Sequence, residues 1–242
     1  MPEEIHVLDK KVRLLQPDTG FRTGLDSVML AAACPAADFE TVLDIGCGVG
    51  GAAFSLLYRE RQIKLTGVDL QPVMIELAQE NAKLNKLEAQ CNFIQSDIRN
   101  FTAPLFDHVI CNPPYLEAAT HVPSPDAGLA MARGHQSEDI SLEDWVKAAH
   151  RLVKSNGSFT LIHRADQLDR IIHALGKMFG KTDIIPLWPK AGEPANRVIV
   201  RTWKDKRSPI TLLPGLIRHE EDGSYTKEAQ LILREGKAFV TD

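Results

Sequence analysis

The sequence lacks several features that would each point to a particular class of protein. Its four cysteines, at positions 34, 47, 91 and 111, form no Cys-x-x-Cys pair, so neither a zinc site nor a redox motif is expected. No apolar run of about 18 residues could span a bilayer, and no N-terminal run resembles a signal peptide. We therefore expect reduced thiols, no metal, no membrane and a cytoplasmic location.

The chain also lacks the basic charge of a protein that grips a long nucleic acid by charge alone. Its formal net charge is −4. Any nucleic-acid partner must therefore be held by a local patch. The late basic run of Arg201, Lys204, Lys206 and Arg207 is the candidate for phosphate contacts, or else a solvated face. Separately, 44% of its residues are apolar, which is enough for a globular core.

At 242 residues, the chain fits one α/β domain. We divide it into an N-terminal arm and helix over 1–40, a core over 41–203 and a tail over 204–242. Strands are expected at 42–45, 63–68, 92–95, 106–111, 158–162, 184–187 and 198–203. Helices are expected after Asp26 or Ser27 as N-cap, and at 52–57, 72–85, 142–154, 168–178 and 227–235. Pro72 is expected at the first position of its helix, Ser141 as an N-cap and Gly236 as a C-cap.

This alternation predicts a doubly wound, seven-stranded, mostly parallel sheet. The last two strands are joined by a short connection, so we expect them to pair antiparallel as a hairpin at one edge. Ligands on such a sheet bind outside the carboxyl ends of its strands. Four successive strands end on a polar residue: Asp44, Asp69, Asp97 and Asn112. Each is also a common helix cap or turn former, so their joint ordering carries the argument.

Glycines crowd the turn after the first core strand, at positions 46, 48, 50 and 51. Such a turn lets the backbone approach a ligand closely and exposes the N–H groups of the helix that follows. The spacing of Gly46, Gly48 and Gly51, with Asp69 further on, matches a dinucleotide fingerprint. Asp44 before the turn favours instead a ligand that carries positive charge. The glycine turn alone leaves both interpretations open.

The sequence from Asn112 to Tyr115, Asn-Pro-Pro-Tyr, follows a strand and points to chemistry on an amine. An exocyclic amine of a base is a poor nucleophile, because its lone pair is delocalised into the ring. The Asn112 oxygen and the Pro113 carbonyl can accept its two hydrogens and return that lone pair to nitrogen. Prolines fix the backbone, and Tyr115 offers a stacking face. An Asn-Pro turn of purely structural role is the alternative.

Together these motifs resemble the class I methyltransferases that use S-adenosylmethionine, and more narrowly the bacterial family that methylates adenine N6 in a valine tRNA. The resemblance covers nearly the whole chain, including Thr23 to Leu30, Asp44 to Gly50 and Ala195 to Arg197. It implies the following cofactor-binding residues: Asp26, Asp44, Gly46, Gly48, Gly50, Asp69, Leu70, Asp97, Ile98 and Asn112.

The same resemblance implies that Asn112, Pro113, Pro114 and Tyr115 are catalytic. It implies substrate contacts from Tyr115, Arg133, Arg197, Arg201 and Lys204. Related turns also serve guanine in ribosomal RNA and glutamine in release factors, and those substrates remain alternatives. The release-factor enzymes usually carry a helical domain before the glycine turn, and only 41 residues precede Val42 here. A nucleotide-binding or NAD-dependent protein is the alternative from another class. Residues 116–140 are expected to be a lid, a substrate clamp or a disordered insertion.

Overall fold

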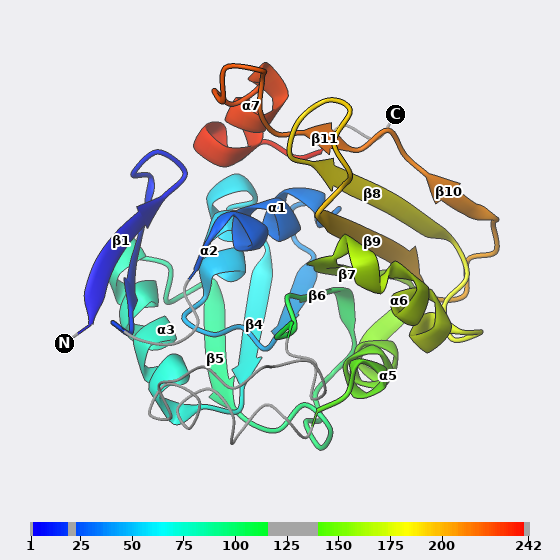
Figure 1. Cartoon of the computed structure of the whole chain (residues 1–242). Helices are drawn as coiled ribbons and strands as arrows, with labels where there is room; N and C mark the ends of the chain where they lie inside the picture. The colour runs from blue at the N-terminus through cyan, green and yellow to red at the C-terminus, as the bar shows by residue number, and fades with distance from the viewer. Residues whose placement is uncertain (1, 19–22, 116–139, 240–242) are drawn as a thin grey trace, which may run out of the picture.

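A computed structural model describes residues 2–18, 23–115 and 140–239 of the chain. Its centre is a nine-stranded sheet in the order β10-β8-β9-β7-β6-β3-β4-β5, with β11 also paired to β8 (Figure 1). The strands are β3 Thr41–Ile45, β4 Lys64–Asp69, β5 Cys91–Gln95, β6 Phe106–Cys111, β7 Val153–Arg164, β8 Thr182–Trp188, β9 Arg197–Trp203, β10 Ile210–Leu212 and β11 Leu216–Ile217.

All seven predicted strands are present, and the sheet is mostly parallel as predicted. β9 runs antiparallel to both of its neighbours, β7 and β8. The antiparallel pair is therefore confirmed, but it does not form the edge, since β10 and β11 add to β8 in parallel. The sequence did not predict these two strands. At three and two residues they are too short to show a period-two pattern.

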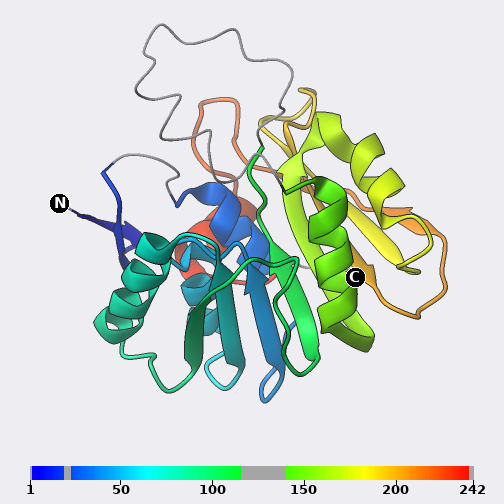
Figure 2. The ribbon, with the colours of Figure 1, turned by 90° about the horizontal axis from the view of Figure 1, so that it is seen from below.

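Helices cover both faces of the sheet. They are α1 Leu25–Ala33, α2 Gly51–Arg59, α3 Pro72–Asn85, α5 Leu142–Leu152, α6 Leu168–Leu175 and α7 Lys227–Glu235, with a 3₁₀ turn at Ala165–Gln167. One buried apolar cluster joins α1, α2, α3 and α7 to the sheet, and a second joins α5 and α6 to it. In both views α5 and α6 lie on the opposite side of the molecule from the N-terminal strands (Figures 1 and 2).

Three of the predicted helix ends are confirmed, whereas the helices expected at 142–154 and 168–178 end earlier, at Leu152 and Leu175. Ser141 forms a capping box with Asp144, Pro72 opens α3, and Gly236 ends α7 in the left-handed conformation at φ 71°. The predicted cap of α1 is wrong, because Gly24 occupies the N-cap position and Asp26 lies in the first turn. The carboxylate of Asp26 is therefore available for contacts outside its own helix.

A hairpin of β1 Glu3–Val7 and β2 Val12–Gln16 forms the N-terminal arm. The arm is anchored by Asn81 of α3, whose side chain is fully buried. Asn81 Oδ1 accepts from the Leu15 N–H at 2.6 Å, while Nδ2 donates to the carbonyls of Leu15 and Val49, both at 3.0 Å. One side chain thus ties the arm and α3 to the loop that contains the glycine turn.

The four cysteines are free, as expected. Cys34, Cys47 and Cys111 are buried, and burial raises the pKa of the Cys34 thiol to about 12. Among the described residues no helix is long and apolar enough to cross a bilayer.

We predict that Asn81→Ala lowers the free energy of unfolding by about 2–3 kcal/mol, because it leaves buried backbone groups of Leu15 and Val49 without partners. Urea unfolding followed by circular dichroism measures the change. Glu80→Ala on the same helix is the matched control, since its ion pair with Lys83 is more than half exposed and should contribute well under 1 kcal/mol. Equal stabilities of the two variants would contradict the anchoring role.

Candidate active site

The register of the parallel strands brings the predicted polar residues to one edge of the sheet. Ile45 of β3 pairs with Val68 of β4 on one side and with Cys111 of β6 on the other. Asp69 is the last residue of β4, one after Val68, and Asn112 directly follows Cys111 at the end of β6. The structure therefore gathers Asp44, Asp69 and Asn112 around the carboxyl end of β3.

The glycine turn folds back onto β4. The N–H groups of Gly46 and Cys47 donate to the Val68 carbonyl at 2.8 and 3.0 Å. Gly46, Gly48 and Gly50 all have positive φ, at 71°, 52° and 90°. Glycine is favoured there because a side chain strains this conformation. A Cβ at Gly48 would meet no heavy atom of the described chain within 4 Å, so this backbone borders open space.

Asp69 is held by the backbone on both sides. Its Oδ2 accepts from the Gly48 N–H and its Oδ1 from the Gln71 N–H, each at 2.9 Å. Burial raises the pKa of this carboxyl, while these two N–H groups oppose the rise. Each oxygen keeps a lone pair, so the carboxylate is oriented to accept from a pair of hydroxyls such as those of a ribose.

Asp44 is more deeply buried than Asp69. Its side chain is 2% exposed, and Oδ2 has no hydrogen-bond partner among the described residues. Burial, followed by the nearby charge of Asp69, raises its pKa to about 8. A buried acceptor beside a second carboxylate is a site that a cation would stabilise. These two acidic side chains therefore fit the positively charged ammonium and sulfonium groups of S-adenosylmethionine.

Asp97, beyond the end of β5, has a different environment. Its carboxylate forms an ion pair with Arg99 at 2.5 Å and also accepts from the Arg99 backbone N–H. The Arg99 side chain holds the pKa of Asp97 below its usual value. Beside it Ile98 is buried, whereas Leu70, after β4, is half-buried. Asp97 is thus a turn former as well as a candidate acceptor.

The Asn-Pro-Pro-Tyr stretch leaves the end of β6 with Pro113 buried and Pro114 exposed. The Tyr115 hydroxyl lies 2.7 Å from Asn112 Oδ1 and 2.9 Å from Asp26 Oδ2. Arg197 Nε donates to the same oxygen of Asp26 at 2.9 Å, and its guanidinium carbon lies 5.0 Å from the centre of the Tyr115 ring. Three distant parts of the chain, represented by Asp26, by Asn112 with Tyr115 and by Arg197, therefore form one cluster.

His163 belongs to this cluster, although the sequence analysis missed it. Its ring meets the Tyr115 ring edge-on, with centroids 4.8 Å apart. Burial lowers the pKa of His163 to about 4, so the ring is neutral near pH 7. It comes directly after the strand predicted at 158–162, and the rule that strand ends carry the site would have identified it.

Of the basic run, Lys206 and Arg207 are exposed as a solvated face would be, whereas Arg201 is buried and Lys204 is half-buried. Arg201 is 7% exposed and pairs with the buried Asp183 at 3.2 Å, so it is not on a surface face. Lys204 Nζ donates to the carbonyls of His150 and Val153, near the start of β7. Because β9 is antiparallel, Arg197 reaches the site edge and Lys204 the opposite edge, roughly 20 Å apart at 3.3 Å per residue. Arg133 and nearly all of the expected lid, 116–139, lie outside the described residues.

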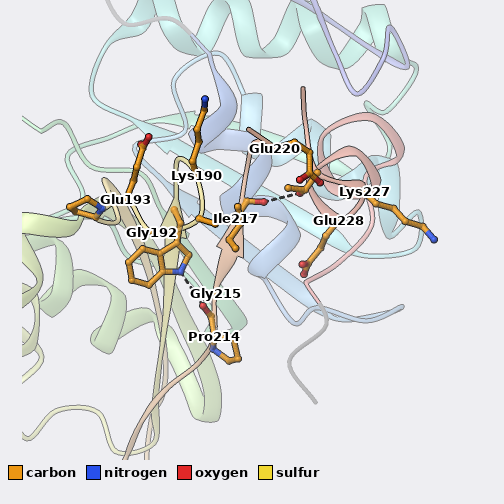
Figure 3. A pocket seen from close by; sticks show the side chains of 13 residues that line it. Lys190, Gly192, Glu193, Pro214, Gly215, Ile217, Glu220, Lys227 and Glu228 are labelled. Carbon is orange, nitrogen blue, oxygen red and sulfur yellow. Dashed lines mark hydrogen bonds between the residues drawn. The ribbon is translucent and has the colours of Figure 1, made fainter. Parts of the chain in front are cut away.

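A separate groove of about 840 Å³ lies beside β8 and the tail (Figure 3). Trp188 is one of the residues that line it, and its Nε1–H donates to the Pro214 carbonyl. Lys190 and Lys227 are mixed with Glu193, Glu220 and Glu228 along it. The groove contains neither the glycine turn nor Asn112, so the chemistry is assigned to the strand ends. Within the described ranges no group of three or more His, Cys, Asp or Glu side chains is placed to hold a metal ion.

The raised pKa of Asp44 predicts a pH-dependent loss of stability. Unfolded Asp44 ionises near pH 4, whereas the folded carboxyl keeps its proton to about pH 8. Stability is therefore intact below pH 4 and falls between pH 4 and 8, at up to about 1.4 kcal/mol per pH unit. Asp44→Asn should remove this slope. The unfolding free energy of the variant, measured with urea, should therefore exceed that of the wild type by a margin that grows from pH 5 to pH 8. Parallel pH profiles would disprove this assignment.

The buried position of Arg201 predicts a role in stability. Arg201→Leu leaves Asp183 buried without its guanidinium and should cost about 3–5 kcal/mol of unfolding free energy. Thermal and urea denaturation test this, with exposed Arg207→Gln as the control that should change stability by less than 0.5 kcal/mol. A wild-type stability for Arg201→Leu together with weaker RNA binding would restore the original surface assignment.

Comparison with known proteins identifies the family and the fold. Curated relatives from Shewanella baltica and Aeromonas hydrophila are both named tRNA1(Val) (adenine(37)-N6)-methyltransferase. Each is 28% identical, the first over 93% of this chain and 96% of its own length, the second over 85% of both. The solved structure of a predicted O-methyltransferase from Agrobacterium tumefaciens has 26% identity and a TM-score of 0.73, covering 89% of this chain and 98% of its own.

The structure of TrmN from Thermus thermophilus, at 18% identity and a TM-score of 0.52, covers 74% of this chain and 48% of its own, and shares the fold. The family model described as "Methyltransferase domain" matches residues 37–210. This match contains β3 to β9, the glycine turn and the Asn-Pro-Pro-Tyr stretch, and it favours methyl transfer over the dinucleotide alternative. The chain belongs to the methyltransferase domain family and, as predicted, is an enzyme that uses S-adenosylmethionine.

Proposed function

We propose that this enzyme methylates N6 of an adenine in a tRNA. The observation that carries the proposal is the position of Asn112 and Tyr115 at the end of β6, beside the glycine turn that follows β3. An amide oxygen and an aromatic ring would thus lie next to a methyl donor bound at that turn. The names of the Shewanella and Aeromonas relatives support adenine N6 in tRNA as the acceptor.

For the cofactor, we propose that the glycine turn and the two buried carboxylates hold S-adenosylmethionine. Asp69 would accept from the ribose hydroxyls, and Asp44 would face the cationic end of the molecule. Gly46, Gly48 and Gly50 let the backbone approach, while Leu70, Asp97 and Ile98 would border the adenine. When bound, the cofactor supplies a methyl group on a sulfonium, so no strong base is needed to activate the acceptor.

The protein's own contribution is the alignment of the amine. Asn112 Oδ1 and the Pro113 carbonyl would accept the two hydrogens of N6 and direct its lone pair toward the methyl group. The Tyr115 ring would stack on the base, worth about 1–3 kcal/mol. The N6 nitrogen would form a bond to the methyl carbon as the carbon–sulfur bond breaks, S-adenosylhomocysteine would leave as a neutral thioether, and one amine proton would pass to solvent. Most of the rate enhancement then comes from proximity and alignment.

Other acceptors remain as outcomes of the tests. Guanine in ribosomal RNA and a protein glutamine also carry an amino group that Asn112 could align. The Agrobacterium structure is named for O-methylation. A hydroxyl acceptor would gain little from two hydrogen-bond acceptors, because it has only one hydrogen.

We predict that Asn112→Ala lowers the single-turnover rate of methyl transfer by about 10²–10³, because Asn112 acts mainly in the transition state. Affinity for S-adenosylhomocysteine, measured by calorimetry, should change little. Asn112→Asp keeps an acceptor oxygen and should retain more activity than Asn112→Ala. Exposed Asn100→Ala is the matched control and should be unaffected. A near-normal rate in Asn112→Ala would make the turn structural.

The substrate is tested by product analysis. Purified enzyme, labelled S-adenosylmethionine and total tRNA from cells without the gene should yield N6-methyladenosine after digestion to nucleosides. Ribosomal RNA and release factor treated in parallel should remain unlabelled. Label in guanosine, in glutamine or on a hydroxyl, with none in adenosine, would replace the proposed acceptor.

A further inference from the structure

The Tyr115 hydroxyl has two acceptors but only one hydrogen. Asn112 Oδ1 lies 2.7 Å away and Asp26 Oδ2 2.9 Å away. A phenol can donate to one of them at a time. Burial, together with the neighbouring Asp26, raises the pKa of Tyr115, so the hydroxyl keeps its proton near pH 7. In this arrangement the phenol can occupy the same Asn112 oxygen that the proposed reaction needs for the substrate amine.

The Asp26 carboxylate is held beside the Tyr115 hydroxyl by Arg197. Arg197 Nε donates to the same Asp26 oxygen at 2.9 Å, and its guanidinium lies over the Tyr115 ring. The edge of the His163 ring meets the ring of Tyr115 as well. With Gly24 as the cap of α1, the Asp26 side chain is not used to end its own helix. Residues from α1, β7 and β9 therefore all contact Tyr115.

We propose that Asp26 is a positioning residue that serves as the reserve acceptor for Tyr115. When a base enters, its amine replaces the phenol at Asn112 Oδ1, and the phenol donates to Asp26 alone. The exchange keeps every hydrogen bond satisfied, so base binding does not lose the energy of an unpaired buried hydroxyl. Arg197 holds Asp26 in place throughout. This rests on the proposed function, and it assigns Asp26 to the base side of the site rather than to the cofactor.

The test is a double-mutant cycle read in single turnover with unmodified tRNA. Asp26→Ala leaves the phenol with Asn112 only, so half-saturation by tRNA should need about tenfold more RNA, with a smaller effect on the maximal rate. Asp26→Asn keeps an acceptor oxygen and should restore most of the affinity. Adding Tyr115→Phe to Asp26→Ala removes the competing phenol and should also restore it. Affinity for S-adenosylhomocysteine should stay within twofold in every variant.

Additive losses in the cycle, or a loss of S-adenosylhomocysteine affinity in Asp26→Ala, would overturn the inference. A second measurement needs no substrate RNA. The chain has three tyrosines, so the ring-carbon signal of Tyr115 labelled with ¹³C at Cζ can be resolved and assigned by Tyr115→Phe. This signal should shift in Asp26→Ala and far less in Asp26→Asn. An unchanged signal disproves the pairing itself, whereas wild-type enzyme that labels no tRNA adenine disproves only the proposed function.

Discussion

The parallel pairing of β3 between β4 and β6 is the constraint on which the site depends. Because all three strands run the same way, their carboxyl ends meet at one edge, and the residues after each strand become neighbours. The N–H groups of Gly46 and Cys47 then bond to the Val68 carbonyl, which pins the turn to the next strand. A one-residue slip of β4 or β6 would move Asp69 or Asn112 off this edge and turn it to the other face of the sheet.

Stability and function oppose each other at that edge. Two carboxylates, Asp44 and Asp69, lie buried close together, and both have raised pKa values in the protein alone. A sheet selected only for stability would place apolar residues there. A cationic ligand at this edge would offset the free-energy cost of burying the two carboxylates. The remaining structure supplies the stability that the site lacks, through two apolar clusters on the two faces of the sheet and side-chain anchors such as Asn81.

The base side of the site follows a different principle, since it is assembled from segments distant in sequence. Asp26 and Arg197 are separated by 171 positions, yet they share one hydrogen bond beside Tyr115. Asn112 and Tyr115 could be found from a short motif after a strand. His163 could have been found from the strand-end rule but carried no motif. The link between Asp26 and Arg197 has no local signal, because it depends on how α1 and β9 pack on the sheet.

Local patterns in the sequence determined the seven main strands, the turn glycines, the caps at Ser141 and Gly236, and the residues at the strand ends. These features depend on neighbours within a few positions, which sequence patterns record. Tertiary structure decided what long-range pairing alone can set. It added the short strands β10 and β11 to β8, buried Arg201 against Asp183, and placed Lys204 at the far end of β9 from Arg197. Arg197 and Lys204 are close in sequence but far apart in space, because the strand between them is extended. Asp26, Tyr115 and Arg197 are distant in sequence but come together, because the sheet and its helices pack around a single edge.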